Sequence, residues 1–354
     1  MRKINILHIT TAFTVGGAEK VILDLILTLD KNVFNNSVMA LAKNPDMLGE
    51  FLDHGIKAEK LDMDKGVGAF VKAFRHIDKY ISENKIDIIH AHLFHPLPLA
   101  SLLKLKHPKL KVVFTSHNTN IGGKLREVIT QFLKPLRNKD IVFSEDMITP
   151  IYKKDTLVIA NGVNIEKFQE PAAKNTPFTF LSVGTVRAQK NQLFLVECAK
   201  ALKEKGYDFV IDIVGGGEEN RALIETIQKE IVKQDVQKHV RMLGVRNDIP
   251  DLLKTAHCMV LPSHYEGLPI VLLEAGAAKI PIISTPVGAI PTLINEDSGY
   301  LTDLDTFCET MGKVYNDYAQ AEEKAGVLAE KIDQHYSIKS MAKAHAELYQ
   351  SLIV

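Results

Sequence analysis

The sequence predicts an α/β protein built from two parallel-sheet domains. Its 354 residues, at roughly 150 residues per domain, indicate about two domains. Hydrophobic residues make up 46% of the chain and charged residues 24%, which is typical of a folded globular protein. Short β-branched runs alternate with helical stretches, and this alternation favours parallel sheets with helical crossovers.

The expected strands fall into two series that are separated by a polar segment. The segment 161–176 is rich in Asn, Gly, Glu and Lys and lacks apolar periodicity, so we expect a linker there. Helical spacing without a further strand follows over 307–333 and 338–352. The expected strands are 4–9, 37–41, 86–90, 112–116, 141–143 and 157–159, then 178–183, 209–214, 240–243, 258–261 and 280–284.

This order of elements predicts two Rossmann-like domains. The first is expected over 1–165 and the second over 166–334, with a helix at 335–354 that packs back towards the first domain. Open parallel sheets bind ligands at the carboxyl ends of their strands. We therefore expect two such domains to face each other across a cleft, with functional residues in the loops that leave the strands.

Charge and cysteine usage exclude several classes of protein. The 43 basic residues balance the 43 acidic ones, so no overall field favours nucleic acid. Cys198, Cys258 and Cys308 form no CxxC pair, so neither a disulfide framework nor a zinc ribbon is expected, and a reducing compartment is favoured. The apolar start is too short for a signal peptide, and no apolar run approaches the roughly 18 residues of a membrane span.

The most informative segment is 262–278, which contains two acidic residues beside an expected helix start. Pro269 suits the first helical position, and the free N–H groups there favour an anion such as a diphosphate. Glu266 precedes this start. Glu274 follows it by roughly 7 to 8 Å along the axis, a distance at which a ribose diol can bind. The alternative is that Glu274 pairs with a basic residue and Glu266 is solvated.

Two further loops carry groups that suit phosphate. Arg187 and Lys190 follow the strand at 178–183, where cations can neutralise a diphosphate leaving group, although a solvated basic turn fits as well. Gly16 and Gly17 precede a helical stretch and permit close approach of a phosphate, but a plain tight turn is equally consistent. The glycine run at 215–217, followed by Glu218, is expected to line the same cleft.

No metal site is expected. His90, His92 and His95 have suggestive spacing, but strand alternation puts only His90 and His92 on one face, Pro96 redirects the chain, and a nearby carboxylate is missing. The DxD triplets at 62–64 and 303–305 lie in polar connecting segments. With a helix start and two cations to hold phosphate, the sequence predicts no metal and no cofactor.

These motifs together resemble the retaining glycosyltransferases of family 4, which have the two-domain GT-B fold. Their signature is a pair of glutamates separated by seven residues, and Glu266 and Glu274 match it within an EGLP loop and an LLEA helix. The resemblance implies that Glu266 touches the donor sugar and Glu274 the ribose. It also implies that the backbone of Gly267, Leu268, Pro269 and Ile270 lines the sugar and phosphate.

The resemblance assigns further residues and a role to each domain. Arg187 and Lys190 would face the diphosphate, His117 in the Thr-Ser-His-Asn segment would meet the transferred sugar, and Val245 and Arg246 would contact the base. The first domain would bind the acceptor, with Gly16 and Gly17 over the donor phosphates, and the second would bind the nucleotide sugar. The sequence departs from the family pattern at Thr185, Glu218, Lys279 and Thr292, and it matches an NGV turn at 161–164 near the domain junction.

The expected function is transfer of a hexose, most often from a UDP-sugar in this family, to an acceptor hydroxyl with retention. A glycan or lipid-linked acceptor in cell-surface polysaccharide synthesis and a cytoplasmic location are implied. The alternatives are a nucleotide-sugar epimerase or hydrolase and a non-catalytic nucleotide-sugar-binding protein. The segment 122–139 mixes basic and apolar residues, which suits either peripheral membrane contact or a solvated helix packed on the first domain.

Overall fold

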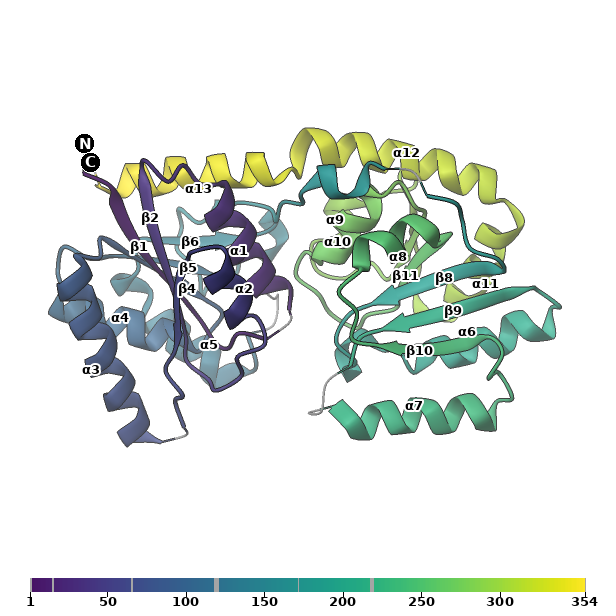
Figure 1. Ribbon diagram of the computed structural model, residues 1–354, viewed down its shortest axis with the longest axis horizontal. Coiled ribbons are helices and arrows are strands. Elements are labelled where there is room, and N and C mark those ends of the chain that lie inside the picture. Colours follow the sequence, from purple (N-terminus) through teal and green to yellow (C-terminus); the bar gives the residue numbers. More distant parts are fainter. Residues whose placement is uncertain are drawn as a thin grey trace. The chain divides into compact units, whose positions relative to one another are not determined.

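The computed structural model describes residues 2–14, 16–64, 66–117, 121–170, 172–216 and 220–353. The chain folds into two compact units (Figure 1). Unit 1 comprises Met1–Asn161 and Ile338–Val354, and unit 2 comprises Gly162–Ser337. The chain thus passes between the units at 161/162 and 337/338, a few residues from the domain limits expected at 165 and 334.

Unit 1 is built on a parallel sheet with the strand order β3-β2-β1-β4-β5-β6-β7. Helices α1 (Gly17–Thr28) and α13 (Ile338–Ile353) pack on each other, and α13 also contacts β1 (Figure 1). Helix α4 (Pro96–Lys106) packs on β4, β5 and α3 (Val67–Asn84). The strands are β1 (Ile4–Thr10), β2 (Phe34–Ala40), β3 (Lys57–Lys60), β4 (Ile88–His92), β5 (Lys111–Thr115), β6 (Lys139–Val142) and β7 (Leu157–Val158).

Unit 2 repeats this plan with the strand order β10-β9-β8-β11-β12-β13. Helix α9 (Ile270–Ala277) packs on α8 (Ile249–Thr255) and α12 (Tyr318–His335), while α6 (Phe194–Glu204) packs on α7 (Arg221–Lys233) and α11 (Leu304–Asn316). The strands are β8 (Phe178–Val183), β9 (Phe209–Val214), β10 (Val240–Gly244), β11 (Cys258–Leu261), β12 (Ile282–Ser284) and β13 (Tyr300–Leu301).

In each sheet, successive strands are added first towards one edge and then towards the other, as the predicted doubly wound fold requires. The reversal lies between β1 and β4 in unit 1 and between β8 and β11 in unit 2. Ligands of such sheets bind outside the carboxyl ends of the strands at this switch point. A ligand site is therefore expected in the loops that follow β1, β4, β8 and β11.

Two short strands and one helix break were not predicted. Strands β3 and β13 lie at the outer edges of their sheets, and β3 has the polar sequence Lys-Ala-Glu-Lys, which carries no β-branched signal. The helical spacing at 307–333 is interrupted at Asp317, whose side chain accepts a hydrogen bond from the backbone N–H of Gln320 at 3.3 Å and so begins α12.

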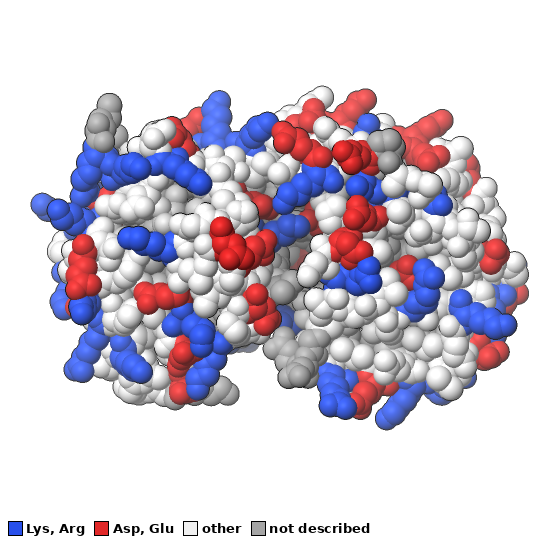
Figure 2. Space-filling model, in the orientation of Figure 1, with Lys and Arg blue, Asp and Glu red and all other residues white. Residues whose placement is uncertain are grey.

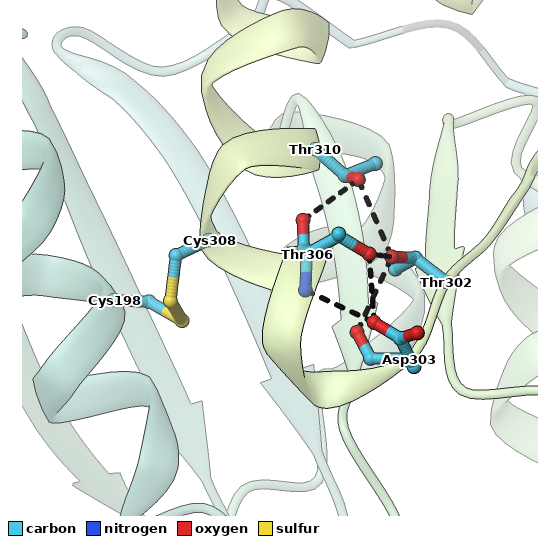
Figure 3. Close-up of a disulfide and its surroundings, with 6 residues drawn as sticks. All are labelled: Cys198, Thr302, Asp303, Thr306, Cys308 and Thr310. Carbon is cyan, nitrogen blue, oxygen red and sulfur yellow. Dashed lines mark hydrogen bonds between the residues drawn. A yellow bond between two sulfur atoms is a disulfide. The ribbon is translucent and has the colours of Figure 1, made fainter.

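The expectation that the cysteines form no disulfide is wrong for one pair. Cys198 of α6 and Cys308 of α11 are joined by a disulfide beside the first turn of α11, where Asp303 caps the helix (Figure 3). The pairing was not foreseen because 110 residues separate the cysteines and only the packing of α6 on α11 brings them together. The inference of a reducing compartment, which depended on unpaired cysteines, loses its basis.

The charged surface agrees with the balanced composition. On the face shown in Figure 2, basic and acidic side chains are interspersed over both units.

Among the described residues, no helix combines the length and the apolar character that a bilayer span requires.

Candidate active site

The loops after β8 and β11 meet at the switch point of unit 2. Gln189 Nε2, from the loop after β8, donates a hydrogen bond to the Tyr265 carbonyl oxygen at 2.7 Å. In return, the backbone N–H of His264 donates to the Gln189 carbonyl oxygen at 2.8 Å. Two reciprocal bonds therefore hold the predicted basic turn against the predicted acidic loop.

An ion pair joins the two predicted site residues that these loops carry. Lys190 Nζ lies 2.7 Å from Glu266 Oε1, and the side chains are only 17% and 6% exposed. The pair is therefore shielded from most of the solvent that weakens surface ion pairs. The alternative reading of Lys190 and Glu266 as solvated side chains is excluded, and the sequence did not predict that they bind each other.

A glycine in the turn after β12 packs against the loop that carries Glu266. Gly288 has φ +58°, and a Cβ at this position would overlap the carbonyl oxygen of Glu266. The backbone N–H of Ala289 donates to the Gly267 carbonyl oxygen at 2.9 Å. Gly288 was not among the predicted site residues, although a glycine within the turn after β12 is the signal that could have identified it.

Helix α9 follows this loop and carries the second glutamate. Pro269 is the N-cap residue and Ile270 the first helical residue, so the expected position of Pro269 was wrong by one residue. Glu274 is 4% exposed in an otherwise apolar helix. At the other end of the helix, Lys279 adopts φ +56°, the left-handed conformation that usually favours glycine.

The glycine-rich turn after β9 packs directly under the loop after β8. The backbone N–H of Gly215 donates to the Gly244 carbonyl oxygen at 2.8 Å, and a Cβ on Gly215 would overlap the carbonyl oxygen of Gly184. Val245, predicted to contact the base, is 59% exposed and lies over Gly216. Gly217 and Glu218 lie outside the described residues.

The two predicted arginines differ from Lys190 in their surroundings. Arg187 is exposed, and its backbone N–H lies 3.4 Å from Gln192 Oε1. Buried Gln192 also donates to the carbonyl oxygens of Gly184 and Thr185, so this residue, which was not predicted, shapes the turn. Arg246 forms a two-point pair with Asp248 at 2.8 and 2.5 Å. That pairing engages the guanidinium that was predicted to contact the base.

In unit 1 the predicted glycine loop begins α1. Gly16 is the N-cap residue in an extended conformation, and Gly17 is the first helical residue. Glu19 in the first turn is 4% exposed, and Thr10 Oγ1 donates to its carboxylate at 2.8 Å. The loop therefore places backbone N–H groups and a buried carboxylate at the carboxyl end of β1.

His117 follows β5 and is held by another histidine. Its Nε2 lies 3.0 Å from His92 Nδ1, and its ring packs edge-on against Phe143. Burial lowers the pKa of His117 to about 3, so its ring is neutral near pH 7. Asn118, the next residue of the predicted motif, lies outside the described residues.

The histidine alternation proved correct, but a third partner was missed. His8 of β1 pairs in register with His90 of β4, and ligand atoms of His8, His90 and His92 lie within 4.8 Å of one another. His95 is separate: its Nδ1 lies 3.4 Å from Thr11 Oγ1, and its Nε2 lies 3.2 Å from a guanidinium nitrogen of Arg126.

The DxD triplets have local partners. Asp62 and Asp64 form ion pairs with Lys60 and Lys43 at 2.7 and 2.6 Å. The side chain of Asp303 accepts a hydrogen bond from the backbone N–H of Thr306 at 3.0 Å, as Figure 3 shows. These carboxylates therefore take part in ion pairs and a helix cap.

Two family models match the chain along most of its length. The model described as Glycosyl transferases group 1 matches residues 163–344, and the model described as Glycosyltransferase Family 4 matches residues 15–167. The matched ranges contain every residue that the sequence predicted for the site.

Curated relatives align with most of the chain at modest identity. A UDP-Gal:alpha-D-GlcNAc-diphosphoundecaprenol alpha-1,3-galactosyltransferase of Escherichia coli is 27% identical, with 89% of each chain covered. The capsular polysaccharide biosynthesis glycosyltransferase CapH of Staphylococcus aureus is 24% identical, with 80% of this chain and 82% of CapH covered.

Solved structures share the fold across nearly the whole chain. HepE of Anabaena, solved in complex with UDP-glucose, superimposes with a TM-score of 0.86 at 17% identity, with 98% of this chain and 100% of HepE covered. Sucrose-phosphate synthase from Thermosynechococcus elongatus gives a TM-score of 0.85 at 17% identity, with 99% of each chain covered. These matches confirm the predicted GT-B fold class.

Proposed function

Because the chain belongs to the glycosyl transferases of group 1, we propose that it moves a sugar from a UDP-sugar to an acceptor hydroxyl with retention at the anomeric carbon. The proposed acceptor is a glycan or a lipid-linked saccharide of a cell-surface polysaccharide. Relatives support this choice, since one is named as a diphosphoundecaprenol galactosyltransferase and another as a capsular polysaccharide glycosyltransferase.

The observation that carries the proposal is the ion pair between Lys190 and Glu266 at the switch point of unit 2. Lys190 supplies positive charge where a diphosphate leaving group would gain negative charge, and Glu266 supplies an acceptor for sugar hydroxyls. Glu274, on the helix that begins after Pro269, is the proposed ribose ligand. The exposed Arg187 is the proposed second phosphate ligand.

Retention is proposed to proceed by attack from the front face of the donor sugar. A double displacement needs an acid and a nucleophile on opposite sides of the scissile bond. Glu266 is engaged by Lys190, and Glu274 is reserved for the ribose in this proposal. The leaving phosphate would then accept the proton of the acceptor hydroxyl, and Lys190 would replace a metal ion as its counter-charge.

A binding screen tests the donor assignment. Thermal shift and calorimetry with UDP, GDP, ADP and their sugars should detect selective stabilisation by UDP and UDP-sugars, because a bound ligand raises apparent stability. Glu274→Ala should weaken this binding, and Glu309→Ala, on the exposed side of α11, is the matched control. Absence of nucleotide binding at millimolar concentration would contradict the donor site and with it the proposed transferase.

Incubation with the donor alone tests the other alternative. A nucleotide-sugar hydrolase or epimerase turns the donor over without an acceptor and releases free sugar or an epimerised nucleotide. The proposed transferase should instead need an acceptor for rapid release of UDP. Fast donor turnover that is unaffected by saccharide acceptors would favour the hydrolase or epimerase reading.

We also propose peripheral membrane contact through α5 (Lys124–Phe132) at the inner face of the cell membrane, with the protein in the cytoplasm. Leu125, Val128 and Phe132 are 74%, 63% and 81% exposed and recur at helical spacing on one side of α5. Lys124 and Lys134 flank the helix ends. An exposed apolar stripe beside basic residues suits the surface of an anionic bilayer, where a lipid-linked acceptor would lie.

A further inference from the structure

The buried face of the unit 1 sheet carries a continuous row of polar side chains. Strand register puts Asn36 of β2, His8 of β1, His90 and His92 of β4, and Thr115 of β5 on the same face of the sheet. This face packs against α13, whose Tyr349 hydroxyl lies 2.7 Å from His90 Nδ1. Parallel strands that are covered on both faces are normally apolar, so a polar row there needs an explanation.

Three of these residues form one chain of hydrogen bonds with His117. His8 Nε2 lies 3.1 Å from Asn36 Oδ1, His8 Nδ1 lies 3.1 Å from His92 Nε2, and His92 Nδ1 lies 3.0 Å from His117 Nε2. The chain starts inside β2 and ends two residues beyond β5. It therefore runs diagonally towards the carboxyl edge of the sheet, where ligands of this fold bind.

The oxygen of Asn36 sets the direction of every bond in this chain. An amide oxygen can only accept, so His8 Nε2 carries the proton and His8 Nδ1 must accept from His92 Nε2. The same logic makes His92 Nδ1 an acceptor for the N–H of His117 Nε2. All three rings are then in the Nε2–H tautomer. Burial lowers the pKa of His8 to about 4 and that of His92 well below its ordinary value, which keeps both rings neutral.

We propose that Asn36, His8 and His92 are positioning residues that hold His117 in the Nε2–H tautomer and leave its Nδ1 as a hydrogen-bond acceptor for a hydroxyl of the transferred sugar. The inference rests on the proposed function in one respect, namely that His117 meets that sugar. Among the described residues, Nδ1 of His117 has no hydrogen-bond partner, so the lone pair is available to a ligand.

His90 has a different part in the same row. Both of its ring nitrogens are engaged by hydroxyls, Tyr349 at Nδ1 and Thr115 at Nε2, each at 2.7 Å. His90 therefore links α13 to β5 beside the chain without belonging to it. The ring nitrogens of His8, His90 and His92 are also close enough to suggest a metal site. Each of them already has a protein partner, which favours the hydrogen-bonded arrangement.

Histidine tautomers measured by long-range ¹H–¹⁵N NMR test the proposal on the full chain without an activity assay. In wild type at pH 7.5, His8, His92 and His117 should all show a protonated Nε2 and an unprotonated Nδ1. Asn36→Leu should leave His117 as a mixture of tautomers. Asn35→Leu, on the opposite face of the same strand, should not, and it is the matched control because Asn35 bonds Asn5 instead. Nδ1–H tautomers in wild type would overturn the proposal.

Kinetics and metal binding give two further readouts. Release of UDP from UDP-glucose, with water as the acceptor, should show kcat about tenfold lower in Asn36→Leu, within the 10²-fold that a misplaced group can cost. KM for UDP-glucose and the melting temperature should stay close to those of Asn35→Leu. If Asn36→Leu and Asn35→Leu lost the same factor in kcat, the row of polar side chains would have only a structural role. A one-to-one zinc complex of wild type that His8→Phe abolishes would also overturn the proposal.

The tautomer result and the activity result separate two kinds of failure. If wild type binds no nucleotide and releases no UDP, the proposed function fails while the tautomers still test the chain of hydrogen bonds. If UDP is released normally in Asn36→Leu although its tautomers are mixed, the link between the chain and the transferred sugar is wrong.

Discussion

Lys190 Nζ and Glu266 Oε1 form a shielded ion pair across two loops that lie 76 residues apart in the sequence. The pair ties the end of β8 to the end of β11 at the switch point of unit 2. In the proposed function, a diphosphate would share Lys190 while sugar hydroxyls bind Glu266.

Lys190→Met should lower turnover and also reduce stability, because the nearly buried Glu266 carboxylate loses the lysine charge. Removal of one preorganised hydrogen-bond donor that stabilises charge in the transition state typically costs roughly 10²- to 10³-fold in kcat. We expect a loss of about this size in sugar transfer, measured as UDP release at saturating donor. Lys313→Met, which breaks an exposed pair with Glu309 on α11, is the control and should leave kcat unchanged. A Lys190→Met protein with wild-type turnover would remove the phosphate role of Lys190.

Gly288→Ala should displace the Glu266 loop. At φ +58° an added Cβ overlaps the backbone carbonyl of Glu266, so the loop must move or the turn must open. We expect the free energy of unfolding to fall by about 1 to 3 kcal/mol, as is usual for overpacking and for strain at positive φ. Urea unfolding measures this change, and weaker UDP binding should accompany it.

Gly326→Ala is the matched substitution for Gly288→Ala. Gly326 lies within α12, and nothing approaches the position of an added Cβ. Helix propensity then predicts a gain of about 0.8 to 1 kcal/mol. If Gly288→Ala behaved like Gly326→Ala, the close packing of Gly288 on the Glu266 loop would be wrong.

Acid should destabilise unit 1 through its buried histidines. Burial lowers the pKa of His8 and of His345 to about 4 and that of His117 to about 3, whereas histidines of the unfolded chain titrate near 6.5. Between these values the unfolded chain binds more protons, so stability falls as the pH drops from about 6.5 towards 4. Each such histidine adds a slope of up to about 1.4 kcal/mol per pH unit.

Unfolding free energies at pH 7.5, 6.0 and 5.0 check this expectation. Values above pH 7 should be nearly constant, because these histidines are then neutral in both states. His345→Phe, at a residue that lines a small cavity together with Leu25, His117 and Met341, should reduce the slope. His54→Gln, at the exposed end of α2 (Leu48–Asp53), is the control. The expectation fails if stability is independent of pH between 7.5 and 5.

Lys279→Gly should stabilise unit 2. A side chain in the left-handed region costs roughly 1 to 2 kcal/mol, and glycine avoids this cost. Part of the gain is offset because glycine loses more conformational entropy on folding than lysine does. We expect a net gain of about 0.5 to 1 kcal/mol in thermal or urea unfolding. Lys229→Gly, at an exposed position within α7, should instead cost about 1 kcal/mol. A loss in both variants would contradict the strain at Lys279.

Binding to lipid vesicles should depend on the exposed stripe of α5. We expect the wild type to cosediment with vesicles that contain about one third anionic lipid, more weakly at high salt because screening shortens the range of the charges. Leu125→Glu with Phe132→Glu should abolish cosedimentation. Val67→Glu with Val232→Glu changes two comparably exposed residues elsewhere and should have no effect. Equal binding by both double variants would exclude α5 as the contact.

Most of the fold could be predicted because buried parallel strands have a strong local pattern. The strands next to the switch points, such as β8 and β11, were expected almost at their observed limits. The edge strands β7 and β10 were expected, whereas the edge strands β3 and β13 were missed. Strand β3 reads Lys-Ala-Glu-Lys, which carries no apolar signal. The motif loops were expected correctly because a strand followed by glycines, cations or a proline-started helix is also a local pattern.

Contacts between segments that lie far apart in the sequence could not be predicted from local patterns. The Lys190–Glu266 pair, the Cys198–Cys308 disulfide and the meeting of His8 with His92 each depend on register or packing rather than on spacing. Alternation within β4 did place His90 and His92 on one face. It carried no information on which residue of β1 would lie opposite them, since that follows from the pairing of His8 with His90.

The discontinuous course of unit 1 bears on how the molecule is made. Residues 162–337 are contiguous, so unit 2 has its whole sequence available before residues 338–353 are synthesised. The β1–β7 sheet, in contrast, waits for α13 to cover its histidine face and to bring Tyr349 to His90. On the ribosome, unit 2 is therefore ready to fold before unit 1, although it is encoded later. Until α13 emerges, the nascent protein exposes the face of the sheet that α13 later covers, and chaperones bind such exposed surfaces.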